Sequence, residues 1–276
     1  MRALEQIRNW PVGHAAAGVV TAAGAVTEGD ADRVFALASV TKPLVAYAVL
    51  VAVEEGAIEL DQPAGPPGST VRHLLAHTSG LAFDTTVIMA EPGARRIYSS
   101  AGFEVLAQFV ADRTGIAFED YLHEAVFEAL GMKSSVLQGP AGHGARSTVA
   151  DLLLFAGELL EPTALSPQTV AEATAVQFPG SNGVLPGYGS QRPNDWGLGF
   201  EIRDHKTPHW TGAANSPRTY GHFGQSGTFL WVDPVPGAAC VALSDENFGD
   251  WARAAWPPLS DAVIGEIAAN RDTAEK

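Results

Sequence analysis

The chain has 276 residues, of which 46% are hydrophobic, and its formal net charge is −14. This length is enough for one large core or two closely packed lobes, and the acidic balance argues against nucleic acid or an anionic membrane as a partner, because both require clustered positive charge. The single cysteine, Cys240, excludes an internal disulfide and a thiolate metal site.

The first part of the chain predicts antiparallel strands that lead into a buried helix. Residues 1–10 show no apolar secretory segment, so we expect a cytoplasmic protein unless a leader precedes this sequence. Residues 15–27 and 33–38 are strand-like, with a tight turn expected at 27–30. The apolar run 44–53 has no polar face, which is typical of a helix buried on all sides, and it is too short to span a membrane.

Ser39 and Lys42 are the first candidate catalytic pair. Pro43 is tolerated only in a first helical turn, so the helix is predicted to begin near Ser39 or Val40. Lys42 then lies one turn from Ser39 on the same face. A serine hydroxyl needs a neighbouring base, and a lysine can act as one only where burial or another cation makes its neutral form accessible. The alternative is that Ser39 only caps the helix and Lys42 is solvated, since this spacing alone is a weak pattern.

The middle of the chain, about 60–170, is predicted to be mostly helical. Periodicity and capping residues predict helices at 71–76, 101–114, 118–130 and 152–160. His73 and His77 have the i, i+4 spacing of two metal ligands, but no Cys or carboxylate cluster lies nearby in the sequence. We therefore expect no metal and a structural rather than catalytic His77; a metal-dependent binding module remains an alternative.

The last third of the chain returns to strand patterns. Residues 177–197 are dense in Gly, Pro and Asn and predict a loop, strands are expected at 198–202, 219–223, 228–232 and 238–243, and a final helix at 259–269. Strands at both ends predict an α+β fold, with an antiparallel sheet built from both chain ends, flanking helices and a mainly helical insert. We expect a single domain, 1–276, with an α/β lobe of about 1–60 plus 190–276 and a helical lobe of about 61–189.

Three short motifs stand in order along the chain: Ser39-Val40-Thr41-Lys42, Tyr98-Ser99-Ser100 and His222-Phe223-Gly224. Together with segments 74–81, 92–93, 147–152 and 196–200, they resemble the serine β-lactamase and penicillin-binding-protein superfamily. The similarity is greatest to its branch of class C β-lactamases, D-alanyl-D-alanine carboxypeptidases and esterases. The resemblance covers most of the chain and implies a β-lactamase-like fold and a serine hydrolase that uses neither metal nor cofactor.

The resemblance also implies a role for individual residues. Ser39 would be the nucleophile, Lys42 would help take its proton, and Tyr98 would be the second proton-transfer partner. Gly224 would end an inner edge strand, and the N–H of Gln225 would join that of Ser39 in an oxyanion hole. Which of Lys42 and Tyr98 holds the proton is left open, because the two should titrate as a coupled set. Tyr98 could instead be a core tyrosine.

Two departures from the family pattern bear on the substrate. Ser100 replaces the asparagine that contacts a substrate amide, and His222 replaces a lysine that holds substrate carboxylates. A hydroxyl lacks the two-way hydrogen bonding of an amide, and a neutral histidine offers less positive charge. Trp196 either fills a core gap or forms a pocket rim.

We therefore expect a hydrolase of a small-molecule ester or amide that acts through an acyl-enzyme on Ser39. The first alternative is a D-amino-acid peptidase or weak β-lactamase. An alternative from another class is an acyl-binding sensor that is acylated without turnover.

Overall fold

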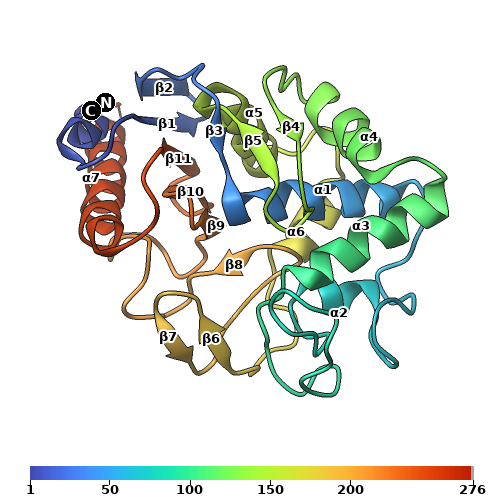
Figure 1. Cartoon of the computed structure of the whole chain (residues 1–276). Helices are drawn as coiled ribbons and strands as arrows, with labels where there is room; N and C mark the ends of the chain where they lie inside the picture. The colour runs from blue at the N-terminus through green and yellow to red at the C-terminus, as the bar shows by residue number, and fades with distance from the viewer. Residues whose placement is uncertain (275–276) are drawn as a thin grey trace.

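The computed structural model describes residues 1–274 and contains a six-stranded antiparallel sheet built from both ends of the chain (Figure 1). The strand order across the sheet is β2-β1-β11-β10-β9-β8. The strands are β1 (Ala15–Thr21), β2 (Gly24–Gly29), β8 (Glu201–Ile202), β9 (Tyr220–Gly224), β10 (Thr228–Asp233) and β11 (Ala238–Ser244). The predicted α+β fold is confirmed.

Helices cover both faces of this sheet. α7 (Asp250–Ala274) and a 3₁₀ helix (Arg2–Asn9) pack together on one face, and α5 (Val149–Leu160) packs against β1 and β11 on the other. The backbone N–H groups of Arg2 and Ala3 donate to the Glu266 carboxylate at 3.1 and 2.9 Å, which holds the two ends of the chain side by side (Figure 1).

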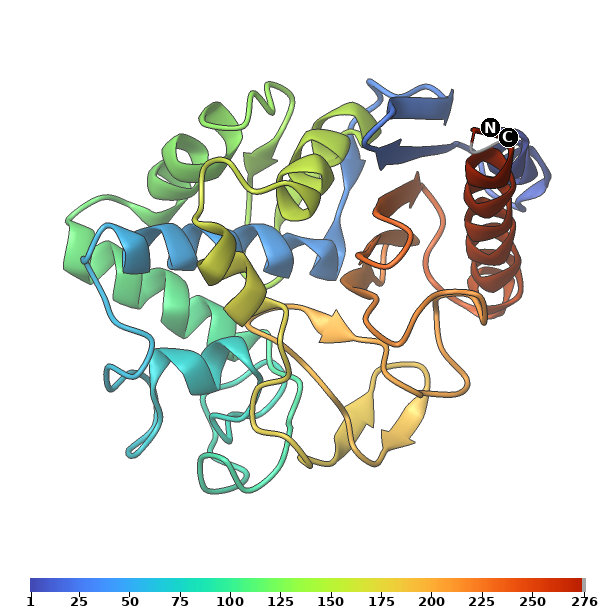
Figure 2. The same ribbon diagram turned by 180° about the vertical axis from the view of Figure 1, so that it is seen from behind.

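α1 (Thr41–Glu54) runs through the middle of the molecule and is surrounded by the remaining helices (Figures 1 and 2). These are α2 (Val71–Leu75), α3 (Ala101–Thr114), α4 (Phe118–Leu122), which continues as a π-helix (His123–Glu128), and α6 (Pro167–Ala173). Residues 44–50 of α1 are at most 1% exposed, as expected from a run with no polar face. The expected cap of α5 also forms, because the Thr148 hydroxyl accepts a hydrogen bond from the Asp151 N–H.

Some short strands differ from the prediction. β3 (Phe35–Ala36) does not join the main sheet but pairs with β5 (Ala145–Ser147), which also pairs with β4 (Val136–Leu137). The turn between β1 and β2 lies at 22–23 rather than 27–30. Gly24 follows that turn with a φ of 114°, which glycine adopts without steric cost. Of the residues predicted to turn, 27–29 instead belong to β2 and pair with β1.

The final helix is longer than predicted. α7 begins at Asp250 and continues through Pro257 and Pro258, whereas the prediction started it only after these prolines. Ala252, Trp256, Leu259 and Val263 recur at helical spacing and are 0% exposed. Burial of this apolar face compensates for the roughly 3 kcal/mol that an interior proline costs a helix.

Two further elements, a hairpin and a short helix, were not predicted individually. The loop expected at 177–197 contains the hairpin β6 (Gly183–Leu185) and β7 (Gly189–Gln191), and α6 lies just before it.

Within residues 1–274, no helix combines the length and apolar composition needed to cross a bilayer. We propose that the two lobes form one domain, because α1 contacts both α3 and β9.

Candidate active site

Ser39 lies in a tight turn immediately before α1. The turn is a 3₁₀ helix (Ala38–Val40), so the α-helix proper begins two residues after Ser39 rather than at it. Two hydroxyls, one in the β9–β10 turn and one at the start of β10, hold the chain that enters this turn. Ser226 Oγ donates to the Ala36 carbonyl at 2.7 Å, and Thr228 Oγ1 donates to the Leu37 carbonyl at 2.9 Å. The position of the serine is therefore fixed relative to the end of β9.

Lys42 is fully buried and lies beside Ser39. Its Nζ is 3.3 Å from Ser39 Oγ, 3.1 Å from Ser100 Oγ and 2.8 Å from the Gly142 carbonyl oxygen. Burial lowers the pKa of Lys42 from 10.5 to about 7, although the charge of Glu104 opposes the shift. A substantial fraction of this amine is therefore neutral near pH 7.

The Gly142 carbonyl is a contact that the sequence analysis did not identify. The Glu104 carboxylate on α3 accepts hydrogen bonds from the N–H groups of Ala141 and Gly142 at 3.1 and 2.8 Å, which fixes this peptide. A Cβ at position 142 would lie 2.9 Å from the Cβ of Ser100, so only glycine fits. The glycines at 139, 142 and 144 were the only signal in the sequence.

Tyr98 and His222 form a second pair at the site. The Tyr98 hydroxyl is 3.3 Å from His222 Nε2, and His222 Nδ1 is 2.7 Å from the Phe223 carbonyl oxygen. Because a carbonyl only accepts, Nδ1 carries the imidazole proton and Nε2 accepts from Tyr98. Burial and the nearby Lys42 lower the pKa of His222 to about 3, so the ring is neutral. Burial raises the pKa of Tyr98, with Ser39 partly opposing the rise, so the phenol is protonated.

Gly224 and Gln225 lie at the end of β9, next to the turn that holds Ser39. The Gln225 N–H donates to no protein group within residues 1–274, while its carbonyl accepts from the Phe248 N–H at 2.8 Å. A Cβ at position 224 would lie 2.3 Å from the Leu37 carbonyl oxygen, so glycine is needed for this close approach. The structure thus leaves an unpaired backbone donor on a residue that lines the same pocket as Ser39.

Ser39, Tyr98, His222 and Gln225 line a pocket of about 320 Å³, and Lys42 lies directly behind Ser39. The pocket is lined by Ser39, Phe83, Tyr98, Leu185, Pro186, Trp196, Glu201, His222, Phe223 and Gln225. Trp196 is 1% exposed and packs against Tyr98 and His222, so it both fills the core and forms a pocket wall. Most of the remaining wall is apolar.

Five lining residues were missed by the sequence analysis: Phe83, Leu185, Pro186, Glu201 and Phe223. Phe83 stacks on Tyr98 with ring centroids 5.9 Å apart and an interplanar angle of 23°. Apart from Phe223, which lies inside the His222 motif, these residues belong to no motif with characteristic spacing. Their place at the pocket follows from tertiary packing alone.

Glu201 is the one carboxylate among the residues that line this pocket, and its charge is compensated by side chains outside the pocket. Its oxygens lie 2.6 Å from Lys206 Nζ, 2.9 Å from His209 Nε2 and 2.9 Å from Trp210 Nε1. Although burial alone would raise the pKa of Glu201, His209 and Lys206 hold it well below its usual range. The carboxylate is thus ionised and paired, and the pocket carries no free negative charge.

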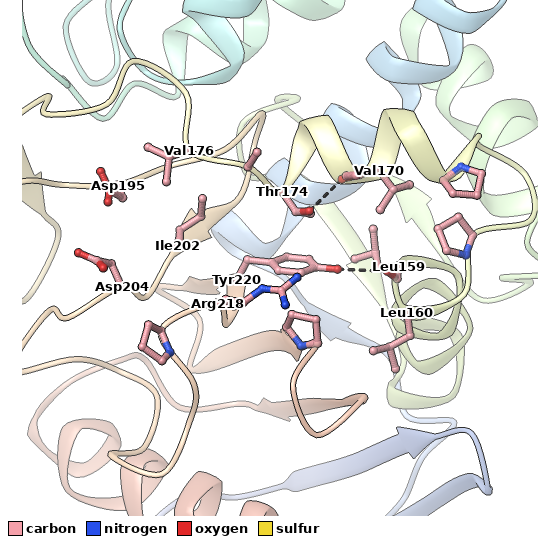
Figure 3. Close-up of a pocket in the computed structure, with 16 residues that line it drawn as sticks. Leu159, Leu160, Val170, Thr174, Val176, Asp195, Ile202, Asp204, Arg218 and Tyr220 are labelled. Carbon is pink, nitrogen blue, oxygen red and sulfur yellow. Dashed lines mark hydrogen bonds between the residues drawn. The ribbon is translucent and has the colours of Figure 1, made fainter.

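A larger cavity of about 570 Å³ lies across β8 from this pocket. Figure 3 shows the residues that line this larger cavity. Asp195 and Ile202 line the cavity, whereas their chain neighbours Trp196 and Glu201 line the pocket around Ser39. The hydroxyls of Thr174 and Tyr220 in the cavity donate to the backbone carbonyls of Val170 and Leu159, respectively. Its lining includes no serine, lysine or histidine, so the smaller pocket is the better candidate for serine chemistry.

The two histidines with metal-ligand spacing have different surroundings. His73 Nδ1 is 2.8 Å from Thr70 Oγ1, whereas the His77 ring packs against Tyr98 and Trp196. In the part of the chain that the structure describes, no group of three or more His, Cys, Asp or Glu side chains is arranged to hold a metal ion.

Comparisons with known proteins identify the family of this chain. The family model described as Beta-lactamase matches residues 7–263. A solved structure of a β-lactamase from Mycobacterium bovis is 62% identical to this chain, with a TM-score of 0.95, and the match covers 96% of this chain and 99% of that one. Penicillin-binding protein 4 of Amycolatopsis lactamdurans is 25% identical over 311 residues, 87% of this chain and 78% of the relative.

Esterase EstB of Burkholderia gladioli is 44% identical over 66 residues, 19% of this chain and 17% of the relative. The chain spans less than half the length of most of the curated relatives it matches. Since the family model covers nearly the whole chain and the 62% identical structure shares its fold throughout, the chain belongs to the β-lactamase family of serine hydrolases.

Proposed function

We propose that this protein hydrolyses uncharged esters or small amides through an acyl-enzyme on Ser39. The observation that carries the proposal is the fully buried Lys42 amine, 3.3 Å from Ser39 Oγ, with a pKa lowered to about 7. A lysine with this pKa can act as a general base near neutral pH, which an ordinary lysine cannot.

The hydrogen bonds of Lys42 are consistent with a neutral amine. A neutral amine has two N–H donors and one lone pair. Gly142 O at 2.8 Å and Ser100 Oγ at 3.1 Å can accept the two donors, which leaves the lone pair to accept the Ser39 hydroxyl proton. In the same pocket the phenol of Tyr98 is protonated, since burial raises its pKa. We therefore assign the base to Lys42 and a proton-relay role to Tyr98.

The reaction then follows from these positions. Ser39 Oγ attacks the substrate carbonyl as its proton passes to Lys42, and the N–H groups of Ser39 and Gln225 stabilise the developing oxyanion. The proton returns through Tyr98 to the leaving-group oxygen or nitrogen as the acyl–heteroatom bond breaks. A water molecule, deprotonated by Lys42, attacks the acyl-enzyme; as the acyl–Oγ bond breaks, the proton passes from Lys42 to Ser39 Oγ, which releases the acid and regenerates the free hydroxyl and the neutral amine.

The lining of the pocket supports an uncharged substrate. His222 is neutral because its pKa is lowered to about 3, and Glu201 is paired with Lys206. Ser100 Oγ is already engaged by Lys42, which leaves it poorly placed to read a substrate amide. The acyl group would contact apolar side chains such as Phe83 and Leu185.

β-Lactam hydrolysis is the second candidate function. It is favoured by one observation, the 62% identity to the Mycobacterium bovis structure described as a β-lactamase. Both candidates use the same nucleophile and base, and they differ only in which substrate the pocket accepts. The neutral His222 argues against β-lactam hydrolysis, because a neutral imidazole brings no positive charge to the carboxylate of a β-lactam.

A substrate panel tests the proposal. We expect short-chain p-nitrophenyl esters to be turned over with kcat/KM well above the values for nitrocefin and a D-Ala-D-Ala peptide. If nitrocefin or the peptide is preferred, the second candidate or a peptidase replaces the esterase. A single stoichiometric burst with no steady-state turnover on any substrate would instead identify an acyl-binding sensor.

A further inference from the structure

We propose that His77 is a positioning residue that holds Tyr98 in place for proton transfer. The inference rests on the proposed function, because it concerns a residue that acts through Tyr98. His77 belongs to none of the three motifs, and its spacing with His73 first suggested a metal pair. Its ring packs against Trp196 and Phe103 as well, but both of its hydrogen bonds to residues beyond its own turn go to the segment that carries the Tyr98 phenol.

His77 binds the chain on both sides of Tyr98. Its backbone carbonyl accepts from the Ile97 N–H at 2.8 Å, and its ring Nδ1 accepts from the Ser99 N–H at 3.2 Å. Between these two bonds, the imidazole packs against the phenol ring with centroids 4.7 Å apart. One residue therefore fixes the backbone before and after Tyr98 and one face of its ring.

The protonation state of His77 follows from the same contacts. A backbone N–H only donates, so Nδ1 must be the unprotonated nitrogen and Nε2 carries the proton. His77 is 1% exposed, and Nε2 has no hydrogen-bond partner within residues 1–274. The ring is thus held in one tautomer by the Ser99 N–H, at the expense of an unpaired buried donor.

The backbone conformation of His77 is also unfavourable for a residue with a side chain. Its φ is 57°, in the left-handed region that residues with a Cβ seldom adopt. An unpaired buried N–H and an unfavourable φ persist only where the surrounding structure requires them, and both are common where strain serves function. Packing alone would be satisfied by an apolar residue here. The acceptor at Nδ1 is the feature that an apolar residue cannot supply.

Two substitutions separate the acceptor from the bulk of the ring. In His77→Asn the amide oxygen lies close to the position of Nδ1, and Asn tolerates the left-handed backbone. In His77→Phe the ring contact with Tyr98 is kept and the acceptor is lost. We expect His77→Asn to keep kcat for a p-nitrophenyl ester within about 5-fold of the wild type, and His77→Phe to lower it about 10- to 100-fold, with KM changed less than about 3-fold in both.

A double-mutant cycle identifies the residue through which His77 acts. In a Tyr98→Phe background there is no hydroxyl left to position, so adding His77→Phe should change kcat less than about 3-fold. His73→Asn is the matched control, because it changes the same residue type one helical turn away, and it should leave kcat unchanged. If His77→Phe does not fold, His77→Gly replaces it, since glycine accepts the φ and also lacks the acceptor.

The outcomes distinguish this inference from the proposed function. If the wild type turns over no ester, the proposed function fails, and the same variants are then ranked by the rate at which a fluorophosphonate labels Ser39. If the wild type is active but His77→Phe matches it, the positioning role is wrong. It is also wrong if His77→Phe lowers kcat equally with and without the Tyr98 hydroxyl, because His77 would then act on the fold and not on Tyr98.

Discussion

The pH dependence of kcat/KM should report the ionisation of Lys42. Its pKa is lowered from 10.5 to about 7 by burial. At pH 8 an ordinary lysine is only about 0.3% neutral, whereas a lysine with a pKa near 7 is about 90% neutral, a difference of roughly 300-fold in the amount of base. Burial of this one side chain therefore raises the amount of neutral amine at pH 8 by more than two powers of ten, and the gain in rate is smaller, because a base of lower pKa is also a weaker proton acceptor.

The direction of the pH effect follows from the state in which Lys42 acts. The neutral amine is the base, so activity should rise with pH to a plateau, with a midpoint near 7 and a roughly tenfold fall for each pH unit below 6. The pKa of His222 is lowered to about 3 and that of His77 lies well below 6.5, so neither ring should account for a midpoint near pH 7. Burial raises the pKa of Tyr98, so no falling limb is expected in this range.

The assay is kcat/KM for a p-nitrophenyl ester from pH 5 to 9, followed at a wavelength where absorbance does not depend on the ionisation of the product. Unfolding is measured at each pH so that a fall in activity caused by loss of structure is not attributed to protonation of Lys42. Lys42→Arg keeps the positive charge but cannot deprotonate, and it should lack the rising limb. A flat wild-type profile, or an unchanged midpoint in the residual activity of Lys42→Ala, would refute the assignment of the base.

Three further predictions concern the oxyanion hole, the proton relay and the substrate. Gly224→Ala should lower kcat about 10²-fold or more, because its Cβ would lie 2.3 Å from the Leu37 carbonyl oxygen and push Gln225 away from Ser39; near-normal kcat would contradict this. Lys42→Ala and Tyr98→Phe should each cost about 10² in kcat, and the double variant should be little worse than the poorer single one; multiplying losses would indicate independent action. His222→Lys with Ser100→Asn should raise the kcat/KM ratio of nitrocefin to ester, and an unchanged ratio would contradict the specificity argument.

Much of the fold could be predicted because it depends on local patterns. The strands at both ends and the buried helix after Ser39 follow from hydrophobic periodicity, and α5 from its capping residues. The start of α7 could not be predicted, since Pro257 and Pro258 are local helix breakers and only packing against the sheet overrides them. The separate sheet of β3 depends on pairing with residues more than a hundred positions away.

In the candidate site, too, the features that follow from local sequence motifs could be predicted, and those that depend on tertiary packing could not. The motifs brought Ser39, Lys42, Tyr98 and His222 to attention, and the structure places them around one pocket or in direct contact with its lining. Their protonation states could not be predicted, because the pKa values depend on burial that no motif encodes. The Gly142 carbonyl, Phe83 and Glu201 were missed for a related reason: each reaches the site from a segment with no characteristic spacing.

The identity of the nucleophile is the central claim, and one measurement tests it most directly. The protein is treated with a fluorophosphonate and the modified peptide is located by mass spectrometry, alongside Ser39→Ala and Lys42→Ala. We predict a single adduct on Ser39, no adduct and no turnover in Ser39→Ala, and slow labelling in Lys42→Ala. An adduct on Ser79 or Ser226, or undiminished turnover in Ser39→Ala, would contradict the account.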